Sequence, residues 1–231
     1  MAVTFAQAGA DTIFVNHLGD EESAEETRRL VQAHGAHVEI VEADVSDPMA
    51  VNAMAREVHD HLGERTLGIL VNNAGAILQP GGWDEQPDND VQRSLMINLG
   101  GAMHCTRAFA PSMKKAGRGA IINIASDNGI TGTAAIASYS AAKAGLIQYT
   151  RNMAVALAPQ IRVNAVAPGV CDTDMTRGAG EEVIQSSLRA TPLRRLGRPE
   201  EIADAVLFLV RNEFTTGTIL SVDGGITLPT T

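Results

Sequence analysis

Two repeating patterns of apolar and polar positions alternate along the chain. Short runs rich in β-branched residues predict buried strands, and longer stretches with apolar residues three or four apart predict helices. The predicted strands cover 12–15, 38–43, 67–71, 120–125, 162–167 and 218–222. The predicted helices cover a short apolar start at 1–9 and then 21–34, 48–62, 90–115, 139–157 and 199–210. A polar stretch over 170–197 fits neither pattern and is expected to be irregular.

This order of elements predicts the fold class. Strands that alternate with helices are typical of an α/β fold, with a mostly parallel sheet covered on both faces. No repeat or linker divides the chain, so we expect one domain over 1–231. The irregular stretch 170–197 is expected to form a substrate lid within it.

Composition excludes several classes of function. The 231 residues carry a formal net charge of −9, and no basic block is longer than Lys114-Lys115, which argues against a nucleic-acid surface. The only cysteines, Cys105 and Cys171, are isolated, which favours a reducing compartment, the cytoplasm. No run approaches the ~18 apolar residues of a membrane helix, and the apolar start lacks the basic flank of a signal peptide. His59 and His61 diverge on a helix, so we expect no metal site.

Candidate chemistry follows the strands. In open parallel sheets, ligands bind beyond the carboxyl ends of the strands. The strand 67–71 is followed by Asn-Asn-Ala-Gly at 72–75, and the strand 120–125 is followed by Ser126. Tyr139 and Lys143 are four residues apart near a helix start, so their side chains share one face.

This pair has a specific chemistry. A free tyrosine has a pKa near ~10, and a nearby ammonium favours the phenolate and lowers that pKa. Tyr139 would then exchange a proton with a carbonyl or alcohol oxygen that Ser126 holds by a hydrogen bond. Because no side chain carries a hydride, a cofactor must supply it.

Together these motifs are similar to the short-chain dehydrogenase/reductase family in its single-domain form, from Met1 to about Thr227. The serine precedes the tyrosine by 13 positions (139 − 126), as in that family. The matching pieces are Asp44-Val45, Asn72-Asn73-Ala74-Gly75, Asn98, Ser126, Tyr139 with Lys143, Pro168-Gly169, Thr173, and Val-Asp-Gly-Gly at 222–225. The resemblance implies a Rossmann-like doubly wound parallel sheet and an NAD(P)-dependent oxidoreductase that interconverts a carbonyl and an alcohol.

The resemblance also implies roles for single residues. Tyr139 is the implied general acid/base, Lys143 lowers its pKa and holds the nicotinamide ribose, Ser126 positions the substrate oxygen, and Asn98 supports a water leading to Lys143. The implied cofactor-binding residues are Asn16, Asp44, Val45, Asn72, Ala74, Gly75, Tyr139, Lys143, Pro168, Gly169, Val170 and Thr173.

Ordinary structural roles are open for the same residues. Asp44 and Asp47, before Pro48, are also explained as turn and cap residues. Ser126 is also explained as a strand-end hydroxyl, and Asn98 as a buried amide that braces a helix. The stretch 72–75 also reads as a plain turn. Asp127 and Asn128 either bond a polyol or cap turns, and caps are slightly favoured.

One diagnostic element of the family has no counterpart. The family begins with a central strand and a glycine-rich turn that seats the cofactor pyrophosphate on a helix N-terminus. Here 1–9 matches only the later part of that helix, so six strands are visible. We expect two unpaired strand edges inside the fold and impaired cofactor affinity.

Several finer expectations complete the analysis. No acidic side chain follows the strand 12–15 before Asp20, which slightly favours NADP(H) over NAD(H). The resemblance implies a small carbonyl or alcohol substrate and a homotetramer or dimer through the helix 90–115 and the last strand. Two alternatives stay open: an impaired paralogue that serves binding or assembly, and a non-redox enzyme that uses Ser126 and Tyr139 for elimination or dehalogenation.

Overall fold

The computed structural model describes residues 1–78, 80–81 and 84–229. Its first half contains α1 (Ala2–Gln7), β1 (Thr12–His17), α2 (Glu21–Gln32), β2 (His37–Glu42), α3 (Pro48–Leu62), β3 (Ile69–Asn72), α4 (Asp88–Leu95), a π-helical turn (Met96–Gly100) and α5 (Gly101–Lys115). Its second half contains β4 (Gly119–Ile124), α6 (Ala137–Leu157), β5 (Ile161–Pro168), α7 (Asp174–Gly178), α8 (Glu181–Ala190), α9 (Pro199–Arg211) and β6 (Ile219–Val222). Two short 3-10 turns, Asp127–Gly129 and Ala134–Ile136, lie between β4 and α6.

All six predicted strands are confirmed, but they form two parallel sheets. β1 pairs with β2, from Thr12 opposite His37 onward. The other sheet has the order β3-β4-β5-β6, and every pair in it is parallel. Parallel pairing brings the carboxyl ends of neighbouring strands to one edge, which is where the candidate residues were expected.

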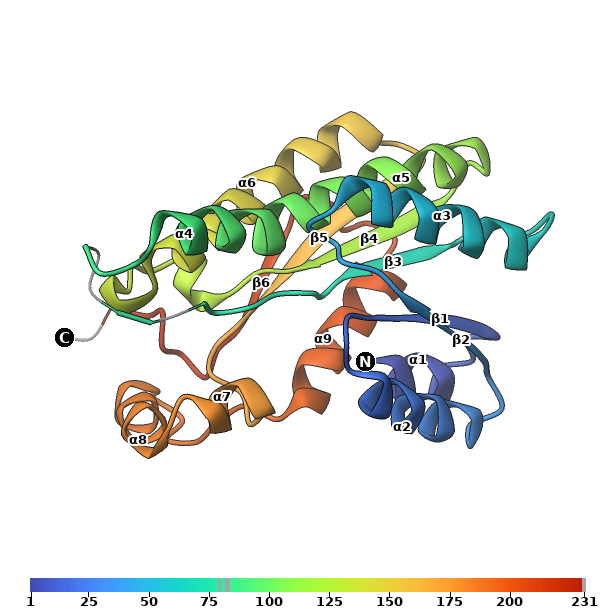
Figure 1. Cartoon of the computed structure of the whole chain (residues 1–231). Helices are drawn as coiled ribbons and strands as arrows, with labels where there is room; N and C mark the ends of the chain where they lie inside the picture. Colours follow the sequence, from blue (N-terminus) through green and yellow to red (C-terminus); the bar gives the residue numbers. More distant parts are fainter. Residues whose placement is uncertain (79, 82–83, 230–231) are drawn as a thin grey trace.

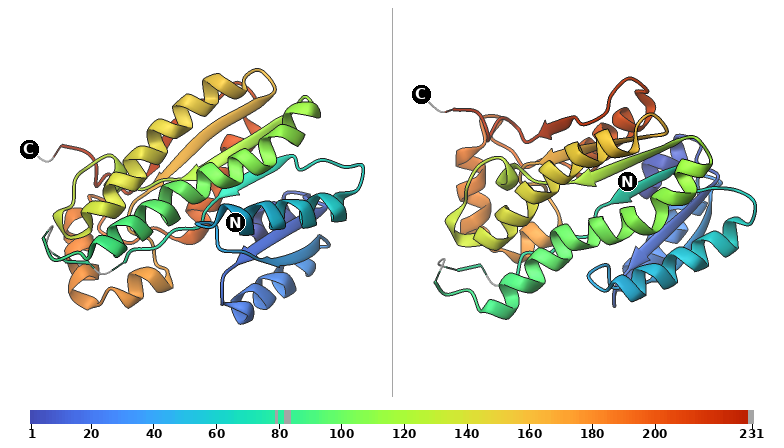
Figure 2. Two further views of the ribbon diagram at one scale, coloured as in Figure 1. Left: turned by 45° about the horizontal axis from the view of Figure 1, so that its top comes forward. Right: turned by 90° about the horizontal axis from the view of Figure 1, so that it is seen from above.

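Helices cover both faces of the sheets. α3, α5 and α6 lie on one face, whereas α9 packs against the other face of β4, β5 and β6 (Figures 1 and 2). α1 and α2 lie on the same side as α9 and pack against β1 and β2. The local sequence explains the helix boundaries: α3 begins at Pro48 with the Asp47 carboxylate accepting a hydrogen bond from the Met49 backbone N–H, and it ends at Gly63, whose φ is 59°.

The expected break in the sheet is present. Among the described residues, β1 pairs only with β2 and β3 pairs only with β4, so one edge of each strand has no partner. Figure 1 shows β1 and β2 as a separate pair of ribbons beside the larger sheet. We call the region between β1 and β3 the seam.

One prediction about regular structure was wrong. The stretch 170–197 is not irregular throughout, because it contains α7 and α8. Ile184 and Leu188 have helical spacing in α8, but the nearby Gly178 and Gly180 and the many polar positions masked that signal. The predicted helix 90–115 is confirmed as one helical stretch over 88–115, which contains a π-helical turn at Met96–Gly100.

Candidate active site

The site is built around the buried ammonium of Lys143. The start of α6 places Tyr139 and Lys143 one turn apart, facing the end of β4. Lys143 is only 3% exposed, and its Nζ donates a 2.8 Å hydrogen bond to the Ile124 carbonyl oxygen at the last position of β4. The same Nζ lies 5.6 Å from the centroid of the Tyr139 ring. The predicted tyrosine–lysine pair therefore points into the carboxyl edge of the larger sheet.

Asn98 joins this pair to the loop after β3. Its side chain lies in the π-helical turn, where Nδ2 donates to the Ser94 carbonyl at 2.9 Å and to the Ala76 carbonyl at 2.8 Å. Its Oδ1 accepts a 3.1 Å hydrogen bond from the Ala76 N–H. The amide thus both braces the helix and ties down the loop after β3. Such π-helical turns are frequent at functional sites, and no feature of the helical pattern had indicated this one.

Gly75 allows the loop to approach closely. A Cβ at this position would lie 2.9 Å from Asn98 Oδ1 and 3.3 Å from Lys143 Nζ. Because any side chain here would collide with the amide and crowd the ammonium, the close approach of this loop requires glycine. The structure therefore brings Gly75, Asn98, Tyr139 and Lys143 together from three separate parts of the chain.

Ser126 follows β4 and faces the same edge. Its Oγ donates a 2.8 Å hydrogen bond to Asp127 Oδ1 and accepts one from the Asn128 N–H at 3.2 Å. The Asn128 N–H also donates to Asp127 Oδ1 at 2.8 Å. These contacts confirm that Ser126 and Asp127 cap the turn after β4. They also place the buried Asp127 carboxyl directly against the candidate substrate-binding hydroxyl.

The pKa of Tyr139 differs from the expectation. Burial raises it, the Asp127 carboxylate raises it further, and the hydrogen bond with Ser126 lowers it. Lys143 is not among the causes of this shift; its Nζ lies 5.6 Å from the Tyr139 ring centroid and donates to the Ile124 carbonyl. Burial also lowers the pKa of Lys143 to about 8. Tyr139 is thus held as the neutral phenol, the form that donates a proton.

The side chains of three expected cofactor-binding residues form hydrogen bonds to other residues of the protein. Asn16 Nδ2 donates to the Val41 carbonyl in β2 and to the Ala43 carbonyl just after β2. These two hydrogen bonds join the end of β1 to β2. Asp44 Oδ1 accepts hydrogen bonds from the backbone and hydroxyl of Ser46, as in a turn. The Asn72 amide is buried and donates to Asn123 Oδ1 at 2.8 Å. All three lie at the expected carboxyl edge, and their side-chain contacts are structural.

The other expected cofactor residues lie along the same edge. Val45 packs against Gly101, where a Cβ would lie 2.7 Å from Val45 Cγ2. Pro168 ends β5 and Ala74 follows β3, while Thr173 precedes α7. Gly169 lies against Asp223, since a Cβ on it would be 2.8 Å from Asp223 Cα. This contact brings the Val-Asp-Gly-Gly motif after β6 next to the end of β5.

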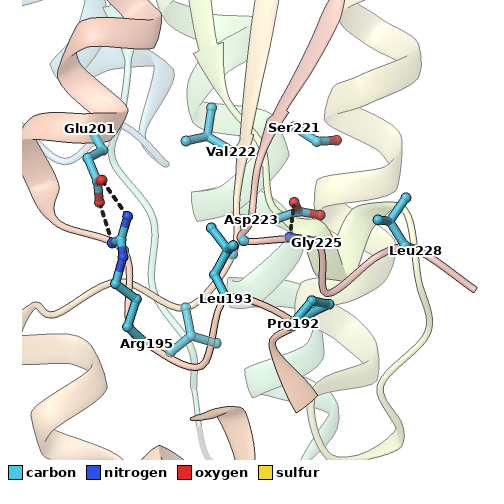
Figure 3. A pocket seen from close by; sticks show the side chains of 13 residues that line it. Pro192, Leu193, Arg195, Glu201, Ser221, Val222, Asp223, Gly225 and Leu228 are labelled. Atoms are coloured by element: carbon cyan, nitrogen blue, oxygen red, sulfur yellow. Dashed lines mark hydrogen bonds and ion pairs between the residues drawn. The ribbon is translucent and has the colours of Figure 1, made fainter. Parts of the chain in front are cut away.

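Sequence reasoning missed Arg195 and Glu201, which lie beside this end of the sheet. They line a hollow of about 480 Å³ together with Gly169, Val170 and Asp223. Figure 3 shows Arg195 and Glu201 pointing toward each other in this hollow. Arg195 and Glu201 form a bidentate ion pair, with Nη2–Oε1 at 2.7 Å and Nη1–Oε2 at 2.8 Å. That pairing holds the pKa of Glu201 at about 2. The two residues are six positions apart across a bend, so no periodic pattern indicated the pair.

The described residues suit the nicotinamide end of a dinucleotide cofactor better than its central pyrophosphate. Lys143 Nζ places one of its three N–H groups on the Ile124 carbonyl, so the ammonium has donors left of the kind that hold ribose hydroxyls. Among the described residues, the edge between β1 and β3 carries no glycine-rich turn that leads into a helix. The described residues thus include donors for the reactive end, and no glycine-rich turn among them supplies the usual backbone donors for the pyrophosphate.

Within 1–78, 80–81 and 84–229, no three His, Cys, Asp or Glu side chains are placed to share a metal ion. No helix in the described part of the chain is long and apolar enough to cross a membrane.

Comparisons with known proteins agree with this geometry. A family model described as enoyl-(acyl carrier protein) reductase matches residues 1–227. The chain is 35% identical to 3-oxoacyl-(acyl-carrier-protein) reductase FabG of Chlamydia muridarum, over 98% of this chain and 91% of that protein. It is 38% identical to cis-4-hydroxycyclohexanecarboxylate dehydrogenase of Sinomonas cyclohexanicum, over 96% of this chain and 88% of that protein.

A solved structure is similar over almost the whole length. It is a gluconate 5-dehydrogenase from Burkholderia cenocepacia in complex with NADP and tartrate, with a TM-score of 0.90 and 30% identity. The similarity covers 99% of this chain and 90% of the solved one.

Proposed function

Because the chain belongs to the short-chain dehydrogenase/reductase family, and is an NAD(P)-dependent oxidoreductase that interconverts a carbonyl and an alcohol, we propose that Tyr139 is its general acid/base. The observation that supports this most is the buried Lys143 ammonium, fixed by the Ile124 carbonyl and lying 5.6 Å from the Tyr139 ring centroid. Lys143 and Asn98 support the tyrosine, and Ser126 positions the substrate oxygen.

The side chains carry the proton part of the reaction. A nicotinamide cofactor held at this edge would supply or accept the hydride. In reduction, the neutral Tyr139 phenol donates its proton to the carbonyl oxygen, and in oxidation the phenolate accepts the alcohol proton. Ser126 Oγ now donates to Asp127 Oδ1, so its O–H turns away from that carboxylate to hold the substrate oxygen. Lys143 then stabilises the phenolate that remains after proton donation.

The cofactor lies along the carboxyl edge in this proposal. Lys143, Tyr139 and Gly75 would hold the nicotinamide ribose, and Gly169, Val170 and Thr173 would hold the carboxamide end. Pro168 shapes the turn before them. Asn72 and Ala74 line the middle of the path, while Asn16, Asp44 and Val45 surround the adenosine. For Asn16, Asp44 and Asn72, whose side chains bond within the protein, the proposed contribution is shape and backbone groups.

We propose NADP(H) as the preferred cofactor. Asp20, the first acidic residue after β1, caps α2 by accepting a hydrogen bond from the Ser23 N–H at 3.1 Å, so it does not point freely at a ribose. Glu42 weighs on the other side, because its Oε1 accepts a hydrogen bond from the Gly19 N–H in the same turn. A carboxylate there disfavours a 2′-phosphate, so the expected preference is small.

The substrate site and the assembly are also part of the proposal. The stretch 170–197 is the proposed lid over a small carbonyl or alcohol within one domain. Leu95, Met96 and Met103 are 37%, 41% and 42% exposed along α4 and α5, an apolar strip that supports a homotetramer or dimer through these helices. Light scattering at micromolar concentration tests the assembly, and a stable monomer would reject it. The free Cys105 and Cys171 support a reducing, cytoplasmic location.

A turnover panel tests the proposed reaction. The chain is assayed with NADPH and NADH against 3-oxoacyl thioesters, ketosugars and simple cyclic ketones, by the loss of reduced-cofactor absorbance. We expect reduction of at least one class at high cofactor concentration. Elimination or dehalogenation without cofactor would instead support the non-redox use of Ser126 and Tyr139.

A further inference from the structure

The Asp127 carboxyl is buried beside Ser126 without a basic partner. Asp127 is only 5% exposed, and within the part of the chain that the structure describes no lysine, arginine or histidine forms an ion pair with it. The ammonium of the site, on Lys143, donates to the Ile124 carbonyl instead. A buried carboxylate without a cation depends on hydrogen-bond donors for its stability.

The donors that Asp127 has all reach one of its two carboxyl oxygens. Oδ1 accepts hydrogen bonds from Ser126 Oγ at 2.8 Å, from the Asn128 N–H at 2.8 Å and from Asn128 Nδ2 at 2.9 Å. None of the described residues donates to Oδ2. An ionised carboxylate accepts hydrogen bonds at both oxygens, so Oδ2 keeps its capacity for a further donor.

The turn that carries Asp127 is held against the helix of the acid/base pair. Gly129 lies against α6, where a Cβ would be only 2.8 Å from the Lys143 carbonyl carbon. The N–H groups of Ile130 and Thr131 both donate to the Asp127 carbonyl oxygen at 2.8 Å. These contacts fix the turn, so the carboxyl has a preformed position beside the proposed acid/base group.

Asp127 interacts electrostatically with groups at three strand ends. Burial raises the pKa of Asp127, the hydrogen bonds to its side chain lower it, and the Asp223 carboxylate after β6 raises it. Burial raises the pKa of Cys171, after β5, to about 11, and Asp127 raises it too. With its own place at the end of β4, the carboxyl therefore lies at the edge where the proposed reaction takes place.

Substrate binding in the proposed reaction changes the donors of this carboxyl. The Ser126 hydroxyl carries one proton, so it donates either to Asp127 Oδ1 or to the substrate oxygen. When it turns to the substrate, the buried carboxyl loses a donor, which costs free energy unless another donor replaces it. A hydroxyl on the carbon next to the reacting one is close enough to be that donor.

A hydroxyl suits this position better than an ammonium group. It donates to the carboxylate, and it also accepts from the protonated acid, whereas an ammonium has no acceptor. The hydroxyl group can therefore pair with Asp127 in either protonation state.

We propose that Asp127 determines substrate specificity by accepting a hydrogen bond from a hydroxyl group on the carbon next to the reacting carbon. The substrate is then an α-hydroxyketone in reduction and a vicinal diol in oxidation. Ketosugars carry such a group, and 3-oxoacyl thioesters do not. This inference rests on the proposed function, because the reacting oxygen is the one that Ser126 holds.

Three matched ketones test the proposal on the full chain with NADPH at high concentration. They are 2-hydroxycyclohexanone, 2-methoxycyclohexanone and cyclohexanone. The methoxy compound keeps the electron-withdrawing oxygen and lacks the donor. We expect kcat/KM for the hydroxy compound to be at least about tenfold higher than for the other two, the size of one hydrogen bond to a charged group. Equal kcat/KM for the hydroxy and methoxy compounds would overturn the proposal.

Variants assign the preference to the carboxyl. Asp127→Ala should reduce the preference for the hydroxy over the methoxy compound to less than about threefold. The turn keeps one cap in this variant, because Ser126 Oγ also accepts from the Asn128 N–H. Asp127→Asn, which keeps the size of the side chain, should reduce the preference less, and Asp60→Ala, at an exposed position on α3, should not change it. An unchanged preference in Asp127→Ala would overturn the proposal. If circular dichroism shows that this variant is unfolded, an unchanged preference in Asp127→Asn would overturn it.

A binding measurement separates this inference from the proposed reaction. If none of the ketones is reduced, the proposed function fails, and saturation-transfer NMR with 2-hydroxycyclohexanone decides the inference. We expect a stronger signal from the hydroxy than from the methoxy compound with the parent chain, and loss of that difference with Asp127→Ala. No signal, or the same difference with both chains, would overturn the proposal.

Discussion

The centre of the larger sheet and the seam consist of similar residues in different surroundings. Ile121 and Ile122 of β4 and Val163 of β5 are 0% exposed. Phe14 of β1 and Leu70 of β3 are only half-buried, although their side chains are equally apolar. The difference comes from neighbours, because β4 and β5 have a strand on each side. Apolar sequence predicts a strand, whereas its burial depends on what lies beside it.

This difference separates the two halves of the proposed site. Ser126 and Lys143 are attached to the closed centre, at the end of β4 and on the helix that packs against β5. Asn16 and Asn72 stand at the border of the seam. We therefore expect the acid/base group to be preformed and the cofactor path to be the weaker part.

The largest expected effect is at the acid/base itself. Tyr139→Phe removes one hydroxyl and should lower kcat by about 10²–10⁴-fold, because the proton donor is lost. Tyr149→Phe is the matched control, since Tyr149 is the other tyrosine of the chain and lies on the same helix. Steady-state kinetics with circular dichroism measures both. Comparable activity of the Tyr139 variant and the parent chain would reject the mechanism.

The packing contrast is tested by a pair of truncations. Ile122→Ala in the closed centre should lower the free energy of unfolding by about 2–5 kcal/mol, because a cavity remains among packed neighbours. Ile13→Ala beside the seam should cost clearly less, since its side chain is only half-buried. Urea unfolding of the two variants decides the point. Equal losses would show that the seam is as tightly packed as the centre.

A smaller effect is expected from adding one methyl group. Gly75→Ala should lower kcat by roughly tenfold, because its Cβ would lie 2.9 Å from Asn98 Oδ1 and disturb the groups around Lys143. Gly68→Ala, beside the seam, has nothing within 4 Å of the added Cβ and should leave kcat unchanged. An equal fall in kcat in the Gly68 and Gly75 variants would contradict the distinction between the two regions.

The smallest expected effect concerns pH. The Asp127 carboxylate raises the pKa of Tyr139, so Asp127→Asn should lower that pKa. Oxidation requires the phenolate, so its rate should rise at lower pH in the variant. Reduction requires the phenol, so its rate should begin to fall at lower pH. Profiles of kcat/KM against pH in both directions measure this shift, and a shift to higher pH would contradict the assignment.

Local spacing explains what could be predicted from the sequence. The six strands follow from their β-branched runs, and the four-residue spacing of Tyr139 and Lys143 placed both on one helix face. The split sheet was also predicted, from the absent first strand. The π-helical turn at Asn98 could not be predicted, because it depends on hydrogen bonds to Ala76, 22 positions away.

Charge and burial were harder to predict than position. The upward pKa shift of Tyr139 depends on burial and on the through-space position of Asp127, which sequence spacing does not contain. Asn16 and Asn72 were expected to face a ligand, and the structure shows their amides bonded to neighbouring strands. Polar residues at strand ends thus predict where a site lies more reliably than which atoms face it.

Cofactor affinity tests the contrast between a preformed acid/base group and an open seam most directly. NADPH and NADH are titrated separately into this chain, and binding is followed by nicotinamide fluorescence. Loss of two or three charge-assisted hydrogen bonds to the pyrophosphate, at ~1.5–3 kcal/mol each, predicts dissociation constants far above the micromolar range, with NADPH slightly tighter. Micromolar binding of either cofactor to this chain would contradict the account, and clearly tighter binding of NADH would contradict the cofactor preference.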